Sequence, residues 1–160
     1  MRRFLIMIIT LSLFATSCKE DAYTYGIVDT DILPVNAVKS KQKTDKQYVS
    51  ILYANLFQKA LSSNRLVELE RVIESLGDKR LARELIISSF MNDPAVILPS
   101  DPEMRDDIDQ FVIDTYKRFY VRPPTEIEKE FFRDYINNDP NVTVEQVYFA
   151  FAISDEYMFY

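Results

Sequence analysis

Histidine is absent from this chain of 160 residues, and cysteine occurs once, at Cys18. Without His, the chain cannot build a Ser-His-Asp triad, a Cys-His pair or the common zinc and haem sites. A single Cys also excludes an internal disulfide, so stability has to come from burial and packing. These absences remove most common hydrolase and metal chemistries, and we expect no catalytic residues, metal ligands or cofactor.

Glycine and basic residues are also scarce. The two glycines, Gly26 and Gly77, cannot form a phosphate-cradling loop or a dinucleotide fingerprint. The formal charge is -6, and it becomes -8 when residues 1–17 are left out, with 17 basic against 25 acidic side chains. A surface of this charge repels nucleic acid and anionic headgroups, so we expect no nucleic-acid partner.

The N-terminus has the pattern of an export signal. Arg2 and Arg3 precede an apolar run over residues 4–14, and small residues follow up to Cys18. This order predicts a signal peptide over residues 1–17. As a helix, the apolar run would rise only about 17 Å, against about 30 Å for the hydrocarbon core of a bilayer. We therefore expect residues 1–17 to be removed; the alternative is a short membrane anchor that stays attached.

The segment Ala15-Thr16-Ser17-Cys18 resembles the lipobox of bacterial lipoproteins, from which it departs at Ala15, where Leu is usual. The resemblance implies that lipid is attached to Cys18 and holds the mature chain on a membrane. Lys19, Glu20 and Asp21 resemble the charged surface-export signal of lipoproteins in the Bacteroidetes. This second resemblance implies placement in the outer membrane with exposure at the cell surface.

Residues 18–44 are polar, and their scattered aliphatic side chains have no helical period. We predict a lipidated Cys18 followed by a flexible tether of about 26 residues, which would span about 30 Å. Lys39, Lys41, Lys43 and Lys46 belong to this stretch and are typical of a linker. The alternative is that residues 32–38 dock as a short strand on the domain or on a partner.

Residues 45–160 predict an all-α domain of about six helices, arranged as two similar three-helix units over residues 45–93 and 101–160. The first unit has apolar stripes over residues 49–60 and 66–76 and a third helix capped by Asp78, with Leu81, Leu85, Ile86 and Phe90 buried. An offset of about sixty residues pairs Leu66 with Ile127 and Glu84 with Glu145. This offset predicts an internal duplication.

The second unit carries clear helix starts. Asp101 is the expected N-cap of a helix that continues to Phe119, with Pro102 at its first position. Thr125 and Thr143 each open a capping box, closed by Glu128 and Gln146. The Thr125 helix is expected to bury four apolar side chains, Ile127, Phe131, Tyr135 and Ile136. The Thr143 helix is expected to continue to Tyr160.

Residues 116–128 and 147–157 resemble a helical module of unknown function from bacterial secreted and surface proteins. The resemblance rests on an Arg-x-Pro-Thr motif at residues 122–125 and a Ser-x-Glu-aromatic motif at residues 154–157. Because these motifs consist largely of helix caps and core positions, the resemblance implies a fold and assigns no chemistry.

Two groups of carboxylates are candidate sites. The densest cluster, which suggests calcium, consists of Asp101, Glu103, Asp106, Asp107 and Asp109. It lacks the glycine turn of an EF-hand, and acids favour a helix N-terminus in any case. Glu126 and Glu130 have the spacing of a carboxylate pair on one helix face, which is ordinarily a solvated face. We interpret both groups as structural.

Aromatic side chains crowd the C-terminus, at Tyr148, Phe149, Phe151, Tyr157, Phe159 and Tyr160. Tyr148 and Phe151 are expected in the core. Tyr157, Phe159 and Tyr160 are the candidate partner-binding residues, because exposed aromatics form contact surfaces; the alternative is that all six pack in the core.

The sequence thus favours a lipid-anchored lipoprotein of the outer membrane or cell surface, acting as a non-catalytic accessory or structural subunit of an envelope protein complex. Its expected partners are the membrane, through the N-terminal lipid, and an envelope protein. The alternatives are a surface glycan-binding module and an enzyme of an unfamiliar kind.

Replacing Cys18 with Ala tests the lipid anchor. We expect Cys18→Ala to leave a soluble or uncleaved precursor, because the apolar run alone is too short to replace the acyl chains. Intact-mass analysis of the wild-type protein should show a mature N-terminus at Cys18 with added acyl mass. Another N-terminus, or no acyl mass, would contradict the prediction.

Overall fold

The computed structural model describes residues 33–35 and 37–159, which belong to one compact unit, Asp31–Tyr160. The expected signal peptide, Cys18, the export signal at Lys19, Glu20 and Asp21, and the terminal Tyr160 lie outside the described residues. Within the described ranges there are seven α-helices, one 3-10 turn and no β-strand. The prediction of an all-α fold is confirmed.

The first three helices of the described residues are α2 (Asp45–Phe57), α3 (Ser63–Ser75) and α4 (Lys79–Met91). Each begins at a side chain that accepts a hydrogen bond from an amide of the first turn, namely Thr44, Ser62 and Asp78. The predicted cap at Asp78 is therefore confirmed.

The next helices are α5 (Asp101–Asp106), α6 (Ile108–Tyr120), α7 (Glu126–Asn138) and α8 (Val144–Ile153). Both predicted capping boxes are present: Thr125 pairs with Glu128 and Thr143 with Gln146. These boxes were predictable because both partners of each lie within four residues of one another.

The helix expected to run from Asp101 to Phe119 is interrupted at Asp107, so that prediction is wrong. Asp107 has φ -142° and ψ 84°, and its carboxylate caps α6 by accepting a hydrogen bond from the Gln110 amide. The N-cap of α5 is Ser100, not Asp101. The Asp101 carboxylate instead accepts a hydrogen bond of 2.7 Å from the Val144 amide at the start of α8.

The last predicted helix is shorter than expected. It ends at Ile153, and the short 3-10 turn η1 (Glu156–Met158) follows instead of a continuation to Tyr160. The Ser154 hydroxyl accepts a hydrogen bond of 3.2 Å from the Tyr157 amide, which stabilises this turn.

The two halves match closely in local structure. The helices α2 and α6 both have 13 residues and start 63 positions apart, and so do α3 and α7. Gln58 and Val121, also 63 apart, end α2 and α6 in the left-handed conformation, with φ of 52° and 56°. Buried residues of α2 and α6 match at the same spacing, as Val49 and Val112 do.

This spacing corrects the register expected from the sequence. The paired residues Leu66 and Ile127 are not equivalent, because Leu66 is half-buried and Ile127 is exposed. At a spacing of 63, Leu69 matches Phe132 and Ile73 matches Ile136, and all four contribute to the core. The third helices, α4 and α8, start 65 positions apart, so Glu84 and Glu145 are not equivalent either.

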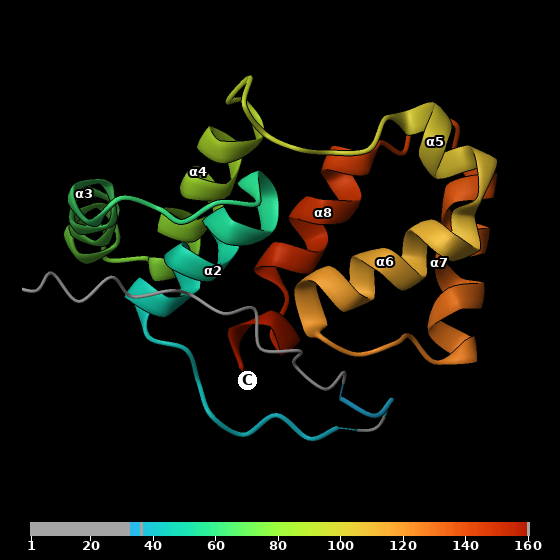
Figure 1. Ribbon diagram of the computed structural model, residues 1–160, viewed down its shortest axis with the longest axis horizontal. Helices are drawn as coiled ribbons and strands as arrows, with labels where there is room; N and C mark the ends of the chain where they lie inside the picture. Colours follow the sequence, from blue (N-terminus) through green and yellow to red (C-terminus); the bar gives the residue numbers. More distant parts are fainter. Residues whose placement is uncertain (1–32, 36, 160) are drawn as a thin grey trace, which may run out of the picture. The chain divides into compact units, whose positions relative to one another are not determined.

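The core lies around α8, which Figure 1 shows between α4 and α6. α2 packs on α3, α6 packs on α7, and α3 and α7 lie at opposite ends of this unit (Figure 1). On α4 the buried face contains Ile86 and Phe90, as expected, while Leu81 and Leu85 are exposed, against expectation. The small Ala82 takes the inward position instead, which allows α4 to approach α8 closely.

Replacing Thr125 with Ala tests the cap of α7. We expect Thr125→Ala to destabilise the domain by about 1 kcal/mol, because the Glu128 amide loses its acceptor. Thermal unfolding measures the difference, with Thr125→Ser as the matched control that keeps the hydroxyl. An unchanged midpoint for Thr125→Ala would contradict the role of the cap.

Candidate functional site

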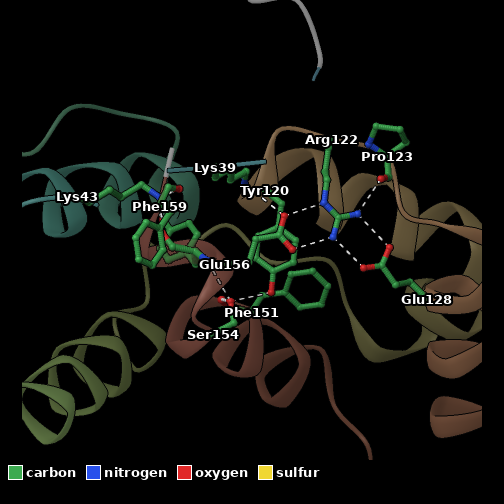
Figure 2. Close-up of polar contacts among 11 residues, drawn as sticks. Lys39, Lys43, Tyr120, Arg122, Pro123, Glu128, Phe151, Ser154, Glu156 and Phe159 are labelled. Carbon is green, nitrogen blue, oxygen red and sulfur yellow. Dashed lines mark hydrogen bonds and ion pairs between the residues drawn. The ribbon is translucent and has the colours of Figure 1, made fainter. Parts of the chain in front are cut away.

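The two motifs of the C-terminal half meet at Arg122, which follows Val121, the C-cap of α6 (Figure 2). Its Nε and Nη2 donate to the two carboxylate oxygens of Glu156, both at 2.7 Å. Nη1 and Nη2 donate to Glu128 at 3.0 and 2.8 Å. We call Arg122, Glu128 and Glu156 the clasp, because they join the starts of α7 and η1 to the end of α6.

Arg122 is buried, with 8% of its side chain exposed. Its guanidinium lies 5.0 and 5.7 Å from the ring centroids of Tyr116 and Tyr120. Nη1 also donates to the Pro123 carbonyl at 3.1 Å, so each of the five N–H donors of the guanidinium has an acceptor. Hydrogen bonds from the guanidinium to Glu128 and Glu156 raise the pKa of Arg122 further above its ordinary value.

Glu128 serves the clasp and the cap of α7 at the same time. Its Oε2 accepts a hydrogen bond of 2.7 Å from the Thr125 amide. Partial burial acts to raise the pKa of Glu128, but the hydrogen bonds from Arg122 and Thr125 outweigh burial and lower the pKa to about 2. The carboxylate is therefore held in its charged form, which suits a structural role better than general acid catalysis.

Residues 37–44, which we call the strap, pack on the C-terminal segment. The Lys43 amide donates to the Met158 carbonyl at 2.8 Å, and Gln42 forms an isolated antiparallel bridge with Phe159. The Lys43 ammonium donates to the carbonyls of Tyr157 and Phe159. Burial, together with the nearby Lys39, lowers the pKa of Lys43 to about 8.

The flexible tether therefore does not extend to residue 44, and the assignment of Lys39 and Lys43 to a linker is wrong. Lys39 lies 3.5 Å from Glu156 of the clasp and 5.2 Å from the Tyr120 ring centroid. The polar composition of residues 18–44 predicted that these lysines would be exposed to solvent. The long aliphatic part of a Lys side chain can nevertheless be buried while its ammonium group binds acceptors. The alternative prediction, that residues 32–38 dock on the domain, is supported at Leu33, whose amide donates a hydrogen bond to the Val121 carbonyl.

The carboxylates of the acidic cluster mostly have structural partners. Glu103 closes a capping box with Ser100, and Asp109 binds Arg133 through hydrogen bonds of 3.0 and 2.7 Å. Glu126 pairs with Lys129, and Glu130 pairs with Arg133. In residues 33–35 and 37–159, no group of three or more Asp, Glu, Cys or His side chains is placed to hold a metal ion.

A surface groove of about 500 Å³ runs beside α5 and α6. Its polar side chains are bound to local partners: Gln110 donates to Asp114, and Arg118 donates to the Ile97 carbonyl. The aromatic residues of its lining, Phe111 and Tyr148, are buried. The groove thus presents no flat exposed ring to a sugar.

The C-terminal aromatics are largely core residues. Tyr148 and Phe151 are buried, as predicted. Tyr157 is 0% exposed, so the expectation that it is an exposed anchor is wrong. Its ring packs against Tyr48, and its hydroxyl accepts a hydrogen bond of 3.0 Å from Asn55. Phe159 is half-buried and Tyr160 lies outside the described residues; contact of these aromatics with a partner stays a prediction.

The largest exposed apolar side chains of the second half lie on α7 instead. Ile127 is 83% exposed, Phe131 61% and Tyr135 44%, so three of the four side chains expected to be buried are not. Only Ile136 faces the core, alongside Phe132. We call Ile127, Phe131 and Tyr135 the α7 stripe, because a spacing of four residues places them on one helix face.

The fold does not require apolar residues at these positions. The equivalent positions of α3, 63 residues earlier, hold Asn64, Glu68 and Val72, which are also exposed. Two helices with the same length and place in their repeats thus present different surfaces, mostly polar on α3 and apolar on α7. The α7 stripe was missed in the sequence because α7 has two apolar faces, and the periodicity does not say which one is buried.

No family model, curated protein or solved structure matches this chain. None of the helices in the described part of the chain has both the length and the hydrophobicity needed to span a membrane.

Replacing Arg122 with Met tests the clasp. Because the change leaves Glu128 and Glu156 without their common partner, we expect a loss of about 3 kcal/mol in the free energy of unfolding at neutral pH. Arg80→Met, which removes an exposed pair with Glu84 on α4, is the control and should have little effect.

The stability of the wild-type protein should also depend on pH through Glu128. Because its folded pKa of about 2 lies below its ordinary value of 4.5, its contribution is present above pH 4.5 and is lost as the pH falls toward 2. Chemical denaturation across this range should show a smaller loss in Arg122→Met. If the free energy of unfolding falls equally with pH in the wild-type protein and in Arg122→Met, the proposed role of the clasp is contradicted.

Proposed function

We propose that this protein is a lipid-anchored lipoprotein of the outer membrane or cell surface that acts as a non-catalytic accessory or structural subunit of an envelope protein complex. In this proposal the α7 stripe contacts the partner protein. The observation that carries it is the exposure of Ile127, Phe131 and Tyr135 at positions where the equivalent helix is mostly polar.

The physical properties of the stripe suit a protein interface. Binding energy at interfaces concentrates in a few aromatic and apolar anchors, and rigid anchors lose little conformational entropy on binding. Phe131 contacts Phe132, whose ring lies 5.3 Å away in an edge-to-face arrangement, and Phe132 packs against Tyr116 of α6. The helix that presents the stripe is therefore fixed to the core from its other side.

The location at the membrane in this proposal rests on the lipobox resemblance at Cys18. The compact unit begins at Asp31, so only residues 19–30 separate the lipidated Cys18 from it. In this proposal the lipid on Cys18 holds the compact unit at the membrane, where an envelope protein can bind the α7 stripe.

A surface glycan-binding module is the second candidate. Phe131 and Tyr135 are exposed, and their ring planes differ by only 4° with centroids 6.2 Å apart. Parallel aromatic rings can stack on sugars, whereas the aliphatic Ile127 cannot. Because Ile127 is the most exposed member of the stripe, the whole surface fits a protein partner better than a glycan.

Exchanging the stripe for the equivalent α3 residues tests the proposed function. We expect the triple variant Ile127→Asn, Phe131→Glu and Tyr135→Val to fold with a nearly unchanged melting temperature, since the fold already accepts these residues on α3. Binding to the envelope partner should weaken by several kcal/mol. Gentle-detergent co-purification with quantitative mass spectrometry measures the loss.

The matched control is Asn64→Ser, Glu68→Gln and Val72→Thr on α3, which should retain the complex. Loss of binding on a glycan array, with the protein complex intact, would favour the glycan-binding module. A folded triple variant that still holds its full complement of partner would refute the contact role of the stripe.

A further inference from the structure

We infer that the partner surface contacted by the α7 stripe is an apolar patch rimmed by Lys and Arg side chains. This inference rests on the proposed function and names the chemistry of the partner. It comes from the charges that flank the stripe.

The flank of the stripe is acidic. Glu126, Glu130 and Asp134 each precede a stripe residue by one position, so they lie beside the stripe on the helix surface, and all three are exposed. Glu126 and Glu130 also pair with Lys129 and Arg133 of the same helix, so this flank holds three carboxylates against two cations and keeps a net negative charge. Arg133 in addition binds Asp109 of α6, which offsets its positive charge.

Charge at the edge of an apolar patch selects the partner. An interface gains specificity when the potentials of its two sides are complementary, and like charges facing each other cost several kcal/mol. A basic rim on the partner satisfies Glu126, Glu130 and Asp134 at the edge, where water remains accessible, while the apolar centre excludes water.

The same flank disfavours the other occupants. When two copies of α7 pack antiparallel about a two-fold axis, the flank with Glu130 and Asp134 faces its own copy, and the carboxylates repel each other. Anionic lipid headgroups are repelled in the same way. Residues 19–32 of this chain hold Lys19 as their one basic side chain, against four acidic ones.

In-cell photo-crosslinking of the full-length protein tests the inference. A benzophenone amino acid replaces Phe131 in one strain and Glu68, the equivalent residue of α3, in a control strain. We expect one protein adduct from position 131, with the crosslinked residue in an apolar surface that has Lys or Arg at its edge, and no such adduct from position 68.

Charge reversal then tests the rim. The triple variant Glu126→Lys, Glu130→Lys and Asp134→Lys should lower the adduct yield at position 131 by about tenfold or more, because like charges then face each other. Glu68→Lys with Glu74→Lys on α3 is the matched control and should leave the yield unchanged. Replacing the partner's rim cations with Glu should restore the adduct of the reversed variant.

The outcomes distinguish a failure of this inference from a failure of the proposed function. An adduct with a second copy, with residues 1–32, with lipid or with a glycan overturns the inference. A protein adduct that survives charge reversal also overturns it but leaves the contact role of the stripe intact. The absence of any adduct at position 131, in a folded protein, overturns the proposed function itself.

Discussion

The buried guanidinium of Arg122 is the interaction on which the arrangement of the second half depends. It binds Glu128 at the start of α7 and Glu156 in η1, and Glu156 in turn lies beside Lys39 of the strap. Two carboxylates would repel each other here without the arginine, and the planar fork of Arg can satisfy both at once. Three segments distant in sequence are thereby fixed around one side chain.

The helix starts were predictable from the sequence, whereas the clasp was not. A capping box such as Thr125 with Glu128 is local, because its partners are three residues apart. Arg122 and Glu156 are 34 residues apart, so their meeting depends on how α6 packs against α8. The motif containing each residue was recognised, but nothing in the spacing indicated that the two motifs bind each other.

The prediction of which side chains are buried was wrong where a residue's type did not match its surroundings in the fold. Lys43 was assigned to a solvated linker, yet its ammonium reaches the carbonyls of the C-terminal segment. Tyr157 was a candidate contact residue, yet its hydroxyl meets Asn55 inside the core. On α7 the opposite error occurred, because Phe131 looked like a core residue and Phe132, its neighbour, is the one that faces inward.

If the chain is held at its N-terminus, as we propose, the strap has a mechanical consequence. A pull on the N-terminus would then act first on the bond between Leu33 and Val121 and next on residues 37–44, which are bonded antiparallel to the chain around Met158. The load therefore acts as shear on several bonds at once, among them those of Lys43, and passes from Glu156 through Arg122 into α7. The helix that carries the exposed stripe would then share the tension with α2, which follows the strap directly in the chain.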